Sequence, residues 1–364
     1  MSKKQFDFCI GNPPYQSGDN ESNSRQDPVY PYFYDAAKKI ADKYELISPA
    51  RFLFNAGLTS KTWNKEMLSD DHIKVEKYVQ NAEDVFPNTD IKGGVAVLYR
   101  DYQRNFGAIE EFIPDEILRG IAKKIRQSNS ESITTIMHGG RSDLLLCDEA
   151  LQDYPNIKED RLLAIQRKNP KVKKLGPNEE KEIKSSSFDV TPYIFLRDIS
   201  SDESEYYRIL GLSNMKREWR YIKKKYVTIR NTKDNNIDLY KTFIPKASGT
   251  GKFGETLSKP ITACPGDSST PTFISIGQYK TKEEADNTVK YVCTKFARAL
   301  LGILKITQDI VPSKWKYVPL QNFTSTSDID WSESISDIDK QLYKKYDLSQ
   351  DEIDFIETHV KEMA

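Results

Sequence analysis

The sequence is poor in cysteine and histidine, and it contains no long hydrophobic run. Its four cysteines lie far apart without a C-x-x-C pair, which argues against a disulfide framework and a cysteine-based zinc site. The three histidines stand in unrelated contexts, so no histidine metal site is predicted. No apolar stretch approaches the length of a transmembrane helix, and the start, MSKKQFDF, does not resemble a signal peptide. We therefore expect a cytoplasmic protein with no membrane partner and no metal.

Length and charge allow two domains of different character. The 364 residues are 38% hydrophobic and 30% charged, which is typical of a globular protein. The net charge of zero is unevenly spread: it is −1 over residues 1–106, +8 over residues 107–325 and −7 over residues 326–364. A basic region is what contact with phosphate requires. A lysine-rich surface without a ligand explains +8 over this length nearly as well, so charge alone does not identify a partner.

The stretch with the most specific chemistry is residues 6–16, FDFCIGNPPYQ. An apolar run here ends abruptly at Asn12-Pro13-Pro14-Tyr15. Because proline cannot extend a strand ladder, the pattern predicts a buried strand whose carboxyl end leads into a rigid loop. Open α/β sheets bind their ligands at this end of the strands. A strand followed by a Pro-Pro turn on the surface is the alternative interpretation.

The residue types of this loop suit the activation of an amino group. An amino group conjugated to a ring is a poor nucleophile because its lone pair is delocalised. Two acceptors aimed at its N–H bonds, the Asn12 side-chain oxygen and the Pro13 carbonyl, would favour a pyramidal nitrogen. Pro13 and Pro14 would hold these acceptors in place before the substrate binds. Tyr15 offers a flat face on which a base extruded from a duplex can stack.

The elements that follow the loop predict the back half of a doubly wound α/β sheet. Apolar residues recur with helical spacing after the loop and again after a short strand, and strands and helices then alternate. The expected helices span 30–44 and 59–67, and the expected strands span 45–48, 73–79 and 95–99.

The loop resembles the catalytic N-P-P-Y motif of amino-group methyltransferases that use S-adenosylmethionine. Their substrates include adenine N6, guanine N2 and the glutamine amide. The order of elements resembles the second half of their Rossmann-like fold, from the catalytic strand to the final antiparallel hairpin. The resemblance implies that Asn12, Pro13, Pro14 and Tyr15 are catalytic, and that Asn12 and Pro14 also contact the cofactor.

Residues 84–101, DVFPNTDIKGGVAVLYRD, resemble the late aromatic motif of the same family. In that motif a phenylalanine before the last strand packs on the second face of the extruded base. Matched by position, this residue is Phe86, so the base would lie between Tyr15 and Phe86. The alternative is that Phe86 only fills space beneath its own loop.

The sequence shows the substrate half of such a site more clearly than the cofactor half. In this family a Gly-rich turn upstream of the catalytic loop holds the cofactor, and here five residues precede the catalytic strand. The downstream run 249–254, GTGKFG, formally matches G-x-G-x-x-G, but such a turn must open a helix and Pro260 follows soon after. We interpret this run as part of a basic loop, and we expect Lys252 in it and Lys246 just before it to contact DNA.

The remaining chain predicts a partial methyltransferase catalytic domain over 1–106, an irregular α/β target-recognition domain over 107–330 and an acidic helical tail over 331–364. Thr281 and Glu284 form a capping box that opens a core helix, expected to run to residue 304. The other elements expected here are a helix over 115–126 and strands over 132–137, 192–196 and 206–212.

The densest basic and aromatic run of the chain spans residues 216–226. Interleaved cations and aromatic rings suit phosphate contact combined with stacking. A strand with exposed lysines on one face is an equally good alternative. The cations predicted to bind DNA here are Lys216, Arg217, Arg220 and Lys223.

The C-terminal half resembles the target-recognition end of type II restriction-modification adenine methyltransferases. We therefore predict a site-specific DNA adenine-N6 methyltransferase that uses S-adenosylmethionine and flips an adenine of double-stranded DNA into the N-P-P-Y pocket. One alternative is a catalytically incomplete recognition subunit or a fragment, which needs a second polypeptide to supply the cofactor half. Another is a component of a fused enzyme whose endonuclease lies elsewhere, because Pro114-Asp115 has no suitable lysine nearby for a nuclease motif.

Overall fold

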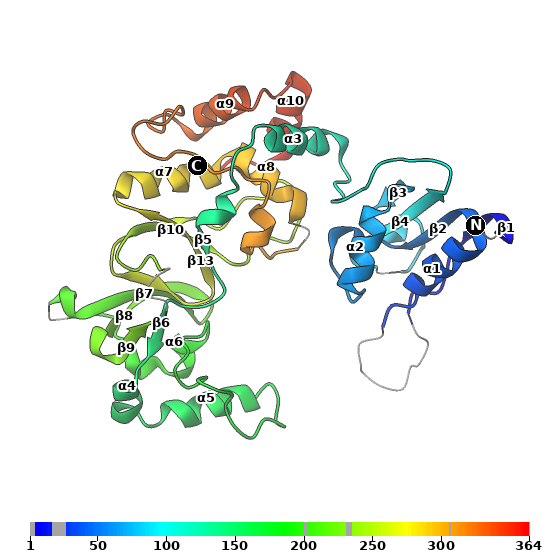
Figure 1. Cartoon of the computed structure of the whole chain (residues 1–364). Helices are drawn as coiled ribbons and strands as arrows, with labels where there is room; N and C mark the ends of the chain where they lie inside the picture. Colours follow the sequence, from blue (N-terminus) through cyan, green and yellow to red (C-terminus); the bar gives the residue numbers. More distant parts are fainter. Residues whose placement is uncertain are drawn as a thin grey trace. The chain divides into compact units, whose positions relative to one another are not determined.

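The chain forms a mixed α/β structure with several small sheets, described here from a computed structural model (Figure 1). The structure describes residues 4–16, 27–89, 91–199, 202–230, 235–305 and 307–363. It divides into two compact units, Met1–Glu116 and Ile117–Ala364. Within the described ranges, no helix is both long enough and apolar enough to cross a lipid bilayer.

A four-stranded sheet organises the N-terminal unit. Its strands lie in the order β1 (Phe6–Gly11), β2 (Ala41–Pro49), β4 (Val95–Asp101) and β3 (Ile73–Val79). β1 and β2 are parallel, and the chain passes between them through helix α1 (Tyr30–Ile40). β4 is antiparallel to both of its neighbours, so β3 and β4 form a final hairpin. The strands expected over 73–79 and 95–99 are confirmed.

The boundary between α1 and β2 differs from the prediction. The helix expected to reach residue 44 ends at Ile40, and β2 begins at once with Ala41. Tyr44, Leu46 and Ser48 are buried alternately along β2, and this period of two belongs to a strand. The apolar residues before Ala41 have helical spacing, so the change to the two-residue period of a strand was not recognised there.

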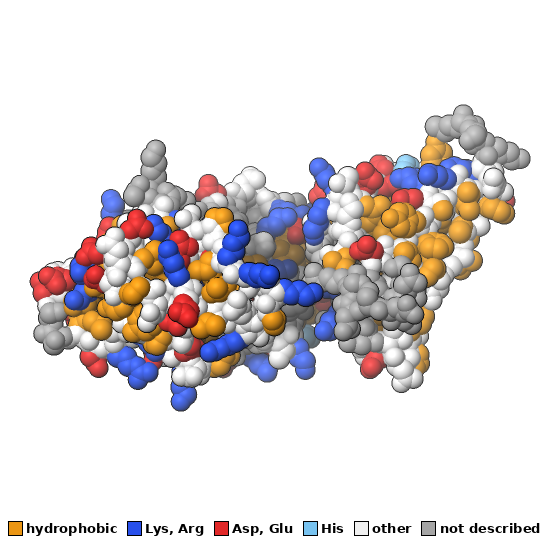
Figure 2. Space-filling view, turned by 90° about the horizontal axis from the view of Figure 1, so that it is seen from below, with side chains coloured by type: hydrophobic (Ala, Val, Ile, Leu, Met, Phe, Trp, Pro, Cys, Tyr) orange, Lys and Arg blue, Asp and Glu red, His pale blue; other side chains and the backbone are white. Residues whose placement is uncertain are grey.

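β1 is an edge strand, and one of its faces is exposed. In the described chain β2 is its one hydrogen-bonded neighbour. Phe6, Phe8 and Ile10 alternate along β1 and are 55%, 45% and 73% exposed. Figure 2 shows hydrophobic side chains on the surface of this unit. Three large apolar side chains on an open strand edge are unusual for a surface that faces only water.

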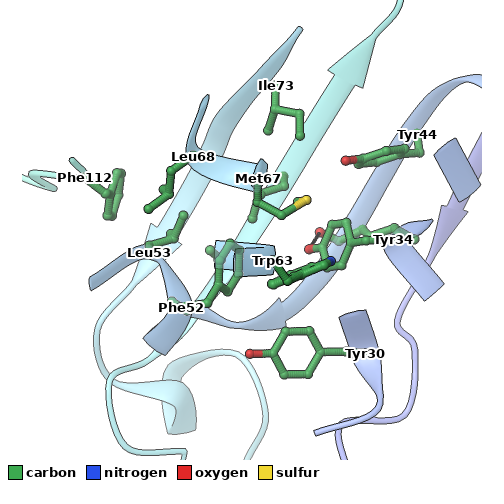
Figure 3. Close-up of a cluster of buried hydrophobic side chains, with 14 of the residues drawn as sticks. Tyr30, Tyr34, Tyr44, Phe52, Leu53, Trp63, Met67, Leu68, Ile73 and Phe112 are labelled. Atoms are coloured by element: carbon green, nitrogen blue, oxygen red, sulfur yellow. Dashed lines mark hydrogen bonds between the residues drawn. The ribbon is translucent and has the colours of Figure 1, made fainter. Parts of the chain in front are cut away.

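Helices α1 and α2 (Lys61–Ser69) cover the opposite face of the sheet and enclose an aromatic core (Figure 3). Phe52 is fully buried, and its ring centroid lies 5.1 Å from that of Trp63. Tyr34 packs edge-on against Tyr44 and donates or accepts a hydrogen bond with Ser48 at 3.0 Å. α2 begins two residues later than the expected start at residue 59, and Ser60 occupies its N-cap position.

Phe52→Ala should destabilise the N-terminal unit by about 3–5 kcal/mol, because it leaves a cavity in this packed core. Hydrogen–deuterium exchange of peptides from β2 and β4 measures the loss directly. Tyr32→Ala is the matched control, since Tyr32 is 71% exposed and should change the unfolding free energy by less than about 0.5 kcal/mol. Equal effects of the two substitutions would contradict the packing described here.

Three small sheets and a set of short helices build the C-terminal unit. The sheets have the orders β11-β10-β13-β5, β12-β7-β8 and β6-β9. The strands are β5 (Met137–His138), β6 (Leu144–Leu146), β7 (Tyr206–Ser213), β8 (Lys216–Lys223), β9 (Val227–Ile229), β10 (Tyr240–Pro245), β11 (Ile261–Ala263), β12 (Asp267–Ser269) and β13 (Phe273–Tyr279). The first helices are α3 (Glu116–Gln127), α4 (Asp148–Asp153), α5 (Ile157–Gln166) and α6 (Ser187–Val190).

The helix expected over 115–126 and the strand expected over 206–212 are confirmed as α3 and β7. The strands expected over 132–137 and 192–196 are wrong, because 3-10 turns occupy Ile133–Ile136 and Pro192–Ile194. Local hydrogen bonds explain both turns. The Ser132 side chain accepts from the Thr134 N–H, and the Phe195 N–H donates to the Pro192 carbonyl. An apolar run too short to show a period did not distinguish a turn from a strand.

The capping box formed by Thr281 and Glu284 is confirmed, but the long helix behind it is two helices, α7 (Lys282–Cys293) and α8 (Lys295–Leu304). Thr294 separates them, and its side chain accepts a hydrogen bond from the Ala297 N–H. Asp339 adds a second cap, because its carboxylate accepts from the backbone N–H groups of residues 295 and 296 at 3.0 and 2.9 Å. The threonine in mid-run was the sequence signal for this break.

The acidic C-terminal segment forms part of the same unit. α9 (Ile335–Lys345) and α10 (Gln350–His359) pack against α8. The ring of Tyr346 stacks on that of Phe296 at a centroid distance of 5.1 Å, and Lys295 forms an ion pair with Glu357. Its acidic side chains are therefore used in part as internal ion-pair partners.

The buried cap at Asp339 predicts a dependence of stability on pH. Burial raises the pKa of Asp339 from 3.8 to about 6, although the backbone N–H groups of α8 oppose this shift. The folded protein therefore binds this proton more tightly than the unfolded chain. Protonated Asp339 contributes its full stabilisation below pH 3.8. As the pH rises from 3.8 to about 6, this contribution to the free energy of unfolding is lost, by roughly 3 kcal/mol.

Urea unfolding of the protein and of Asp339→Asn between pH 4 and pH 7 tests this dependence. The unfolding free energy of the unsubstituted protein, relative to that of the variant, should fall as the pH rises. The reason is that Asp339 ionises in this range and an asparagine at the same position does not. A difference that stays constant, or grows with pH, would refute the direction of the shift.

Candidate active site

The loop Asn12–Tyr15 leaves the sheet at the carboxyl end of β1. Gly11 pairs with Leu46, and hydrogen bonding between the two parallel strands stops there. The backbone then returns to the start of α1, because the Val29 N–H donates to the Tyr15 carbonyl at 3.1 Å and Gln16 pairs with Pro28. The loop is thus held at both ends beside the carboxyl end of β2, where α/β sheets bind ligands.

Within the loop, the side chains differ in burial. Pro13 is buried, whereas Asn12 and Pro14 are exposed. The Asn12 side chain lies beside the Tyr15 hydroxyl, but the two do not form a hydrogen bond of normal geometry. The Asn12 side chain is therefore exposed and has no hydrogen-bond partner of normal geometry among the described residues.

The rings of Tyr15 and Phe86 lie close together but are not parallel. Their centroids are 6.5 Å apart and their planes meet at 66°, an edge contact. A base stacked between two rings needs both rings parallel to it, so one ring must turn to admit the base. Burial raises the pKa of Tyr15, and its buried hydroxyl has no hydrogen-bond partner in the described chain.

A pocket of about 430 Å³ adjoins Tyr15. Of the side chains that line it, Arg51 and Lys92 are the charged ones, and both are exposed. The sequence analysis missed these two residues. Their positions in the sequence could have indicated them. Arg51 follows Pro49, which ends β2, and Lys92 precedes the paired glycines before β4. The pocket is lined by Tyr15, Gln16, Pro28, Tyr30, Pro49, Arg51, Gly57, Leu58, Thr59, Thr89, Ile91 and Lys92.

The glycine-rich run 249–254 is folded around the side chain of the next residue, Glu255. The Glu255 carboxylate accepts hydrogen bonds from the backbone N–H groups of Thr250 and Gly251 and forms an ion pair with Lys305 at 3.0 Å. Burial by itself would raise the pKa of Glu255, but these contacts lower it to about 2. No helix follows the run, so its N–H groups serve an internal anion instead of a cofactor phosphate or carboxylate.

The basic run 216–226 lies mainly on β8, and its cations differ in their availability. Arg220 is 3% exposed, with its guanidinium bound to Glu218, the Phe188 carbonyl and Ser213. It is therefore committed to the interior of the C-terminal unit.

Arg217 is partly buried and donates to the Lys259 carbonyl at 2.6 Å. Lys216 is exposed and Lys223 is half-buried. Of the two lysines predicted in the later loop, Lys252 is exposed and Lys246 is half-buried.

Among the residues that the structure describes, no group of three or more His, Cys, Asp or Glu side chains is placed to hold a metal ion. The structure thus brings together Asn12, Tyr15 and Phe86 in the N-terminal unit, whereas all the cations predicted to bind DNA lie in the C-terminal unit.

Comparison with known proteins agrees with the N-terminal part of this description. A search of curated proteins finds no match to the chain. Residues 1–86 match the sequence model of the family described as Eco57I restriction-modification methylase. The matched segment contains β1, the Asn12–Tyr15 loop and Phe86. The match supports a relation of this segment to restriction-modification methylases.

Proposed function

We propose that the chain is a DNA adenine-N6 methyltransferase of a restriction-modification system, with S-adenosylmethionine as its methyl donor. The observation that carries the proposal is the placement of Asn12–Tyr15 at the carboxyl end of β1, with the Phe86 ring against the Tyr15 ring. The match of residues 1–86 to the methylase family supports the class of reaction. The parallel pair β1–β2 followed by the hairpin β3–β4 is what the second half of a Rossmann-like methyltransferase sheet requires.

In this proposal the loop acts on the adenine amino group. The Asn12 side-chain oxygen and the Pro13 carbonyl accept its two N–H bonds, which localises the nitrogen lone pair. Tyr15 and Phe86 stack on the extruded base once the edge contact between their rings opens. Asn12 and Pro14 would contact the cofactor, and the cofactor would supply the methyl group. The glycine-rich run 249–254 would not take part, because its N–H groups bind Glu255.

Sequence reading is proposed for the region 107–330. Of the cations predicted to bind DNA, Lys216, Lys223, Lys246 and Lys252 are exposed or half-buried and would contact phosphate. Arg217 joins them only if its contact with the Lys259 carbonyl is released, and Arg220 is not included because it is buried.

Asn12→Ala should lower methyl transfer at least about 100-fold while DNA affinity changes little, because one of two preorganised acceptors is lost. Asn12→Asp is the matched control, since it retains an oxygen acceptor at the same place and should keep more activity than alanine. Transfer of labelled methyl groups to unmodified DNA, with chromatography of the nucleosides, measures the rates. Turnover by Asn12→Ala at the unsubstituted rate would refute the role of the loop.

The open edge of β1 favours a second candidate function, that of a recognition subunit whose cofactor half comes from a second polypeptide. Phe6, Phe8 and Ile10 are exposed on one face of this strand. A further parallel strand would pair with the N–H and C=O groups of its outer edge, which have no strand partner in the described chain. Such a strand would extend the sheet on the side away from β2.

Isothermal calorimetry of the full chain with S-adenosylmethionine separates the two candidates. A complete site should bind the cofactor in the micromolar range. A site that needs a partner should show no heat of binding until that partner is added, because half of the contacts are missing. Micromolar binding by the chain alone would rule out the second candidate.

A further inference from the structure

The pocket beside Tyr15 contains a cation that the rest of the protein leaves unused. Arg51 lies on the 3-10 turn Ala50–Phe54 that follows β2. Its guanidinium makes no ion pair and no hydrogen bond with any described residue, although a guanidinium carries five donors and is always charged. The Arg51 charge lies close enough to Tyr30 to oppose the rise in the tyrosine pKa that burial causes.

Two glycines shape a slot for this side chain. A Cβ atom added at Gly93 would lie 2.8 Å from the Arg51 Cγ atom, and one added at Gly57 would lie 3.4 Å from the Arg51 Cβ atom. Both glycines also have positive φ angles, 89° and 92°, which side-chain-bearing residues rarely adopt. The base of the arginine side chain is thus confined, while its charged end remains exposed.

Two hydroxyl groups of the pocket also lack partners among the described residues. The hydroxyl groups of Tyr15 and Thr59 are buried and make no hydrogen bond of normal geometry with any described residue. Lys92 adds a second positive charge, and the described residues that line the pocket include no acidic side chain. Buried polar groups are normally satisfied, so a cluster of unsatisfied groups around a cation indicates a missing anionic ligand.

We propose that Arg51 binds a backbone phosphate of the DNA strand whose adenine enters the pocket. This inference rests on the proposed function, because it assumes that the base stacks on Tyr15. Arg51 and Tyr15 line the same pocket, and a phosphate lies one sugar away from its base. The arginine fork suits phosphate oxygens. Arg51 is then a positioning residue, which fixes the extruded nucleotide while Asn12 acts on its amino group.

The test compares 2′-deoxyadenosine 5′-monophosphate with 2′-deoxyadenosine as ligands of the full chain, followed by NMR or calorimetry. The unsubstituted protein should bind the nucleotide at least about tenfold more tightly than the nucleoside, a difference of about 1.4 kcal/mol. Arg51→Ala should remove this preference without weakening nucleoside binding. Arg51→Lys should retain part of it, because the charge remains but the fork is lost.

Lys77→Ala is the matched control, since Lys77 is an exposed cation of β3 in the same unit that does not line the pocket. It should leave the preference unchanged. A preference that survives Arg51→Ala, or that Lys77→Ala removes equally, would overturn the inference. So would a loss of S-adenosylhomocysteine binding in Arg51→Ala with the nucleotide preference intact, because the anion would then be the cofactor carboxylate.

The same titrations separate this inference from the proposed function. If the unsubstituted protein binds deoxyadenosine but shows no preference for the phosphate, the assignment of Arg51 fails and the base pocket stands. If it binds neither ligand, the base pocket itself is wrong, and the proposed function loses its main support.

Discussion

The end of β1 fixes the position of the Asn12–Tyr15 loop. Pro13 and Pro14 have no N–H groups, so the strand cannot continue to pair with β2 beyond Gly11. The backbone is forced out of the sheet and returns to α1 through the bond between the Tyr15 carbonyl and the Val29 N–H. The carbonyl and amide oxygens of the loop are therefore fixed at the edge of the sheet. The aromatic core under β2, built around Phe52 and Trp63, holds that edge in place.

Part of this structure was predictable from residue types that lie close together in the sequence. The strand, the Pro-Pro loop and the capping box at Thr281 each depend on residue types within a few positions, and the sequence is sufficient to identify them. The proximity of Tyr15 and Phe86 was reached through family resemblance, since 70 intervening residues leave no local signal. The edge geometry of the two rings was not predictable from either source, because it depends on how the loops pack.

The sequence interpretation was less successful where long-range contacts decide the structure. The second cap at the start of α8 comes from Asp339, on a helix over 40 residues later in the chain. The interior position of Arg220 depends on Phe188 and Ser213, which come from two other elements. Arg51 was missed because its lack of partners is visible only in the structure. The two glycines that lie against it are 36 residues apart in the sequence. Charge density along the sequence therefore gave a poor guide to which cations are free.

The central claim is that the Asn12–Tyr15 loop presents its acceptors to the amino group of adenine in DNA. Single-molecule sequencing of DNA from cells that express the full chain, compared with cells that do not, tests this claim most directly. The account predicts N6-methyladenine at one recurring sequence, in nearly all copies. Methyl groups on another atom, such as a cytosine carbon, or N6-methyladenine with no preferred sequence, would contradict it.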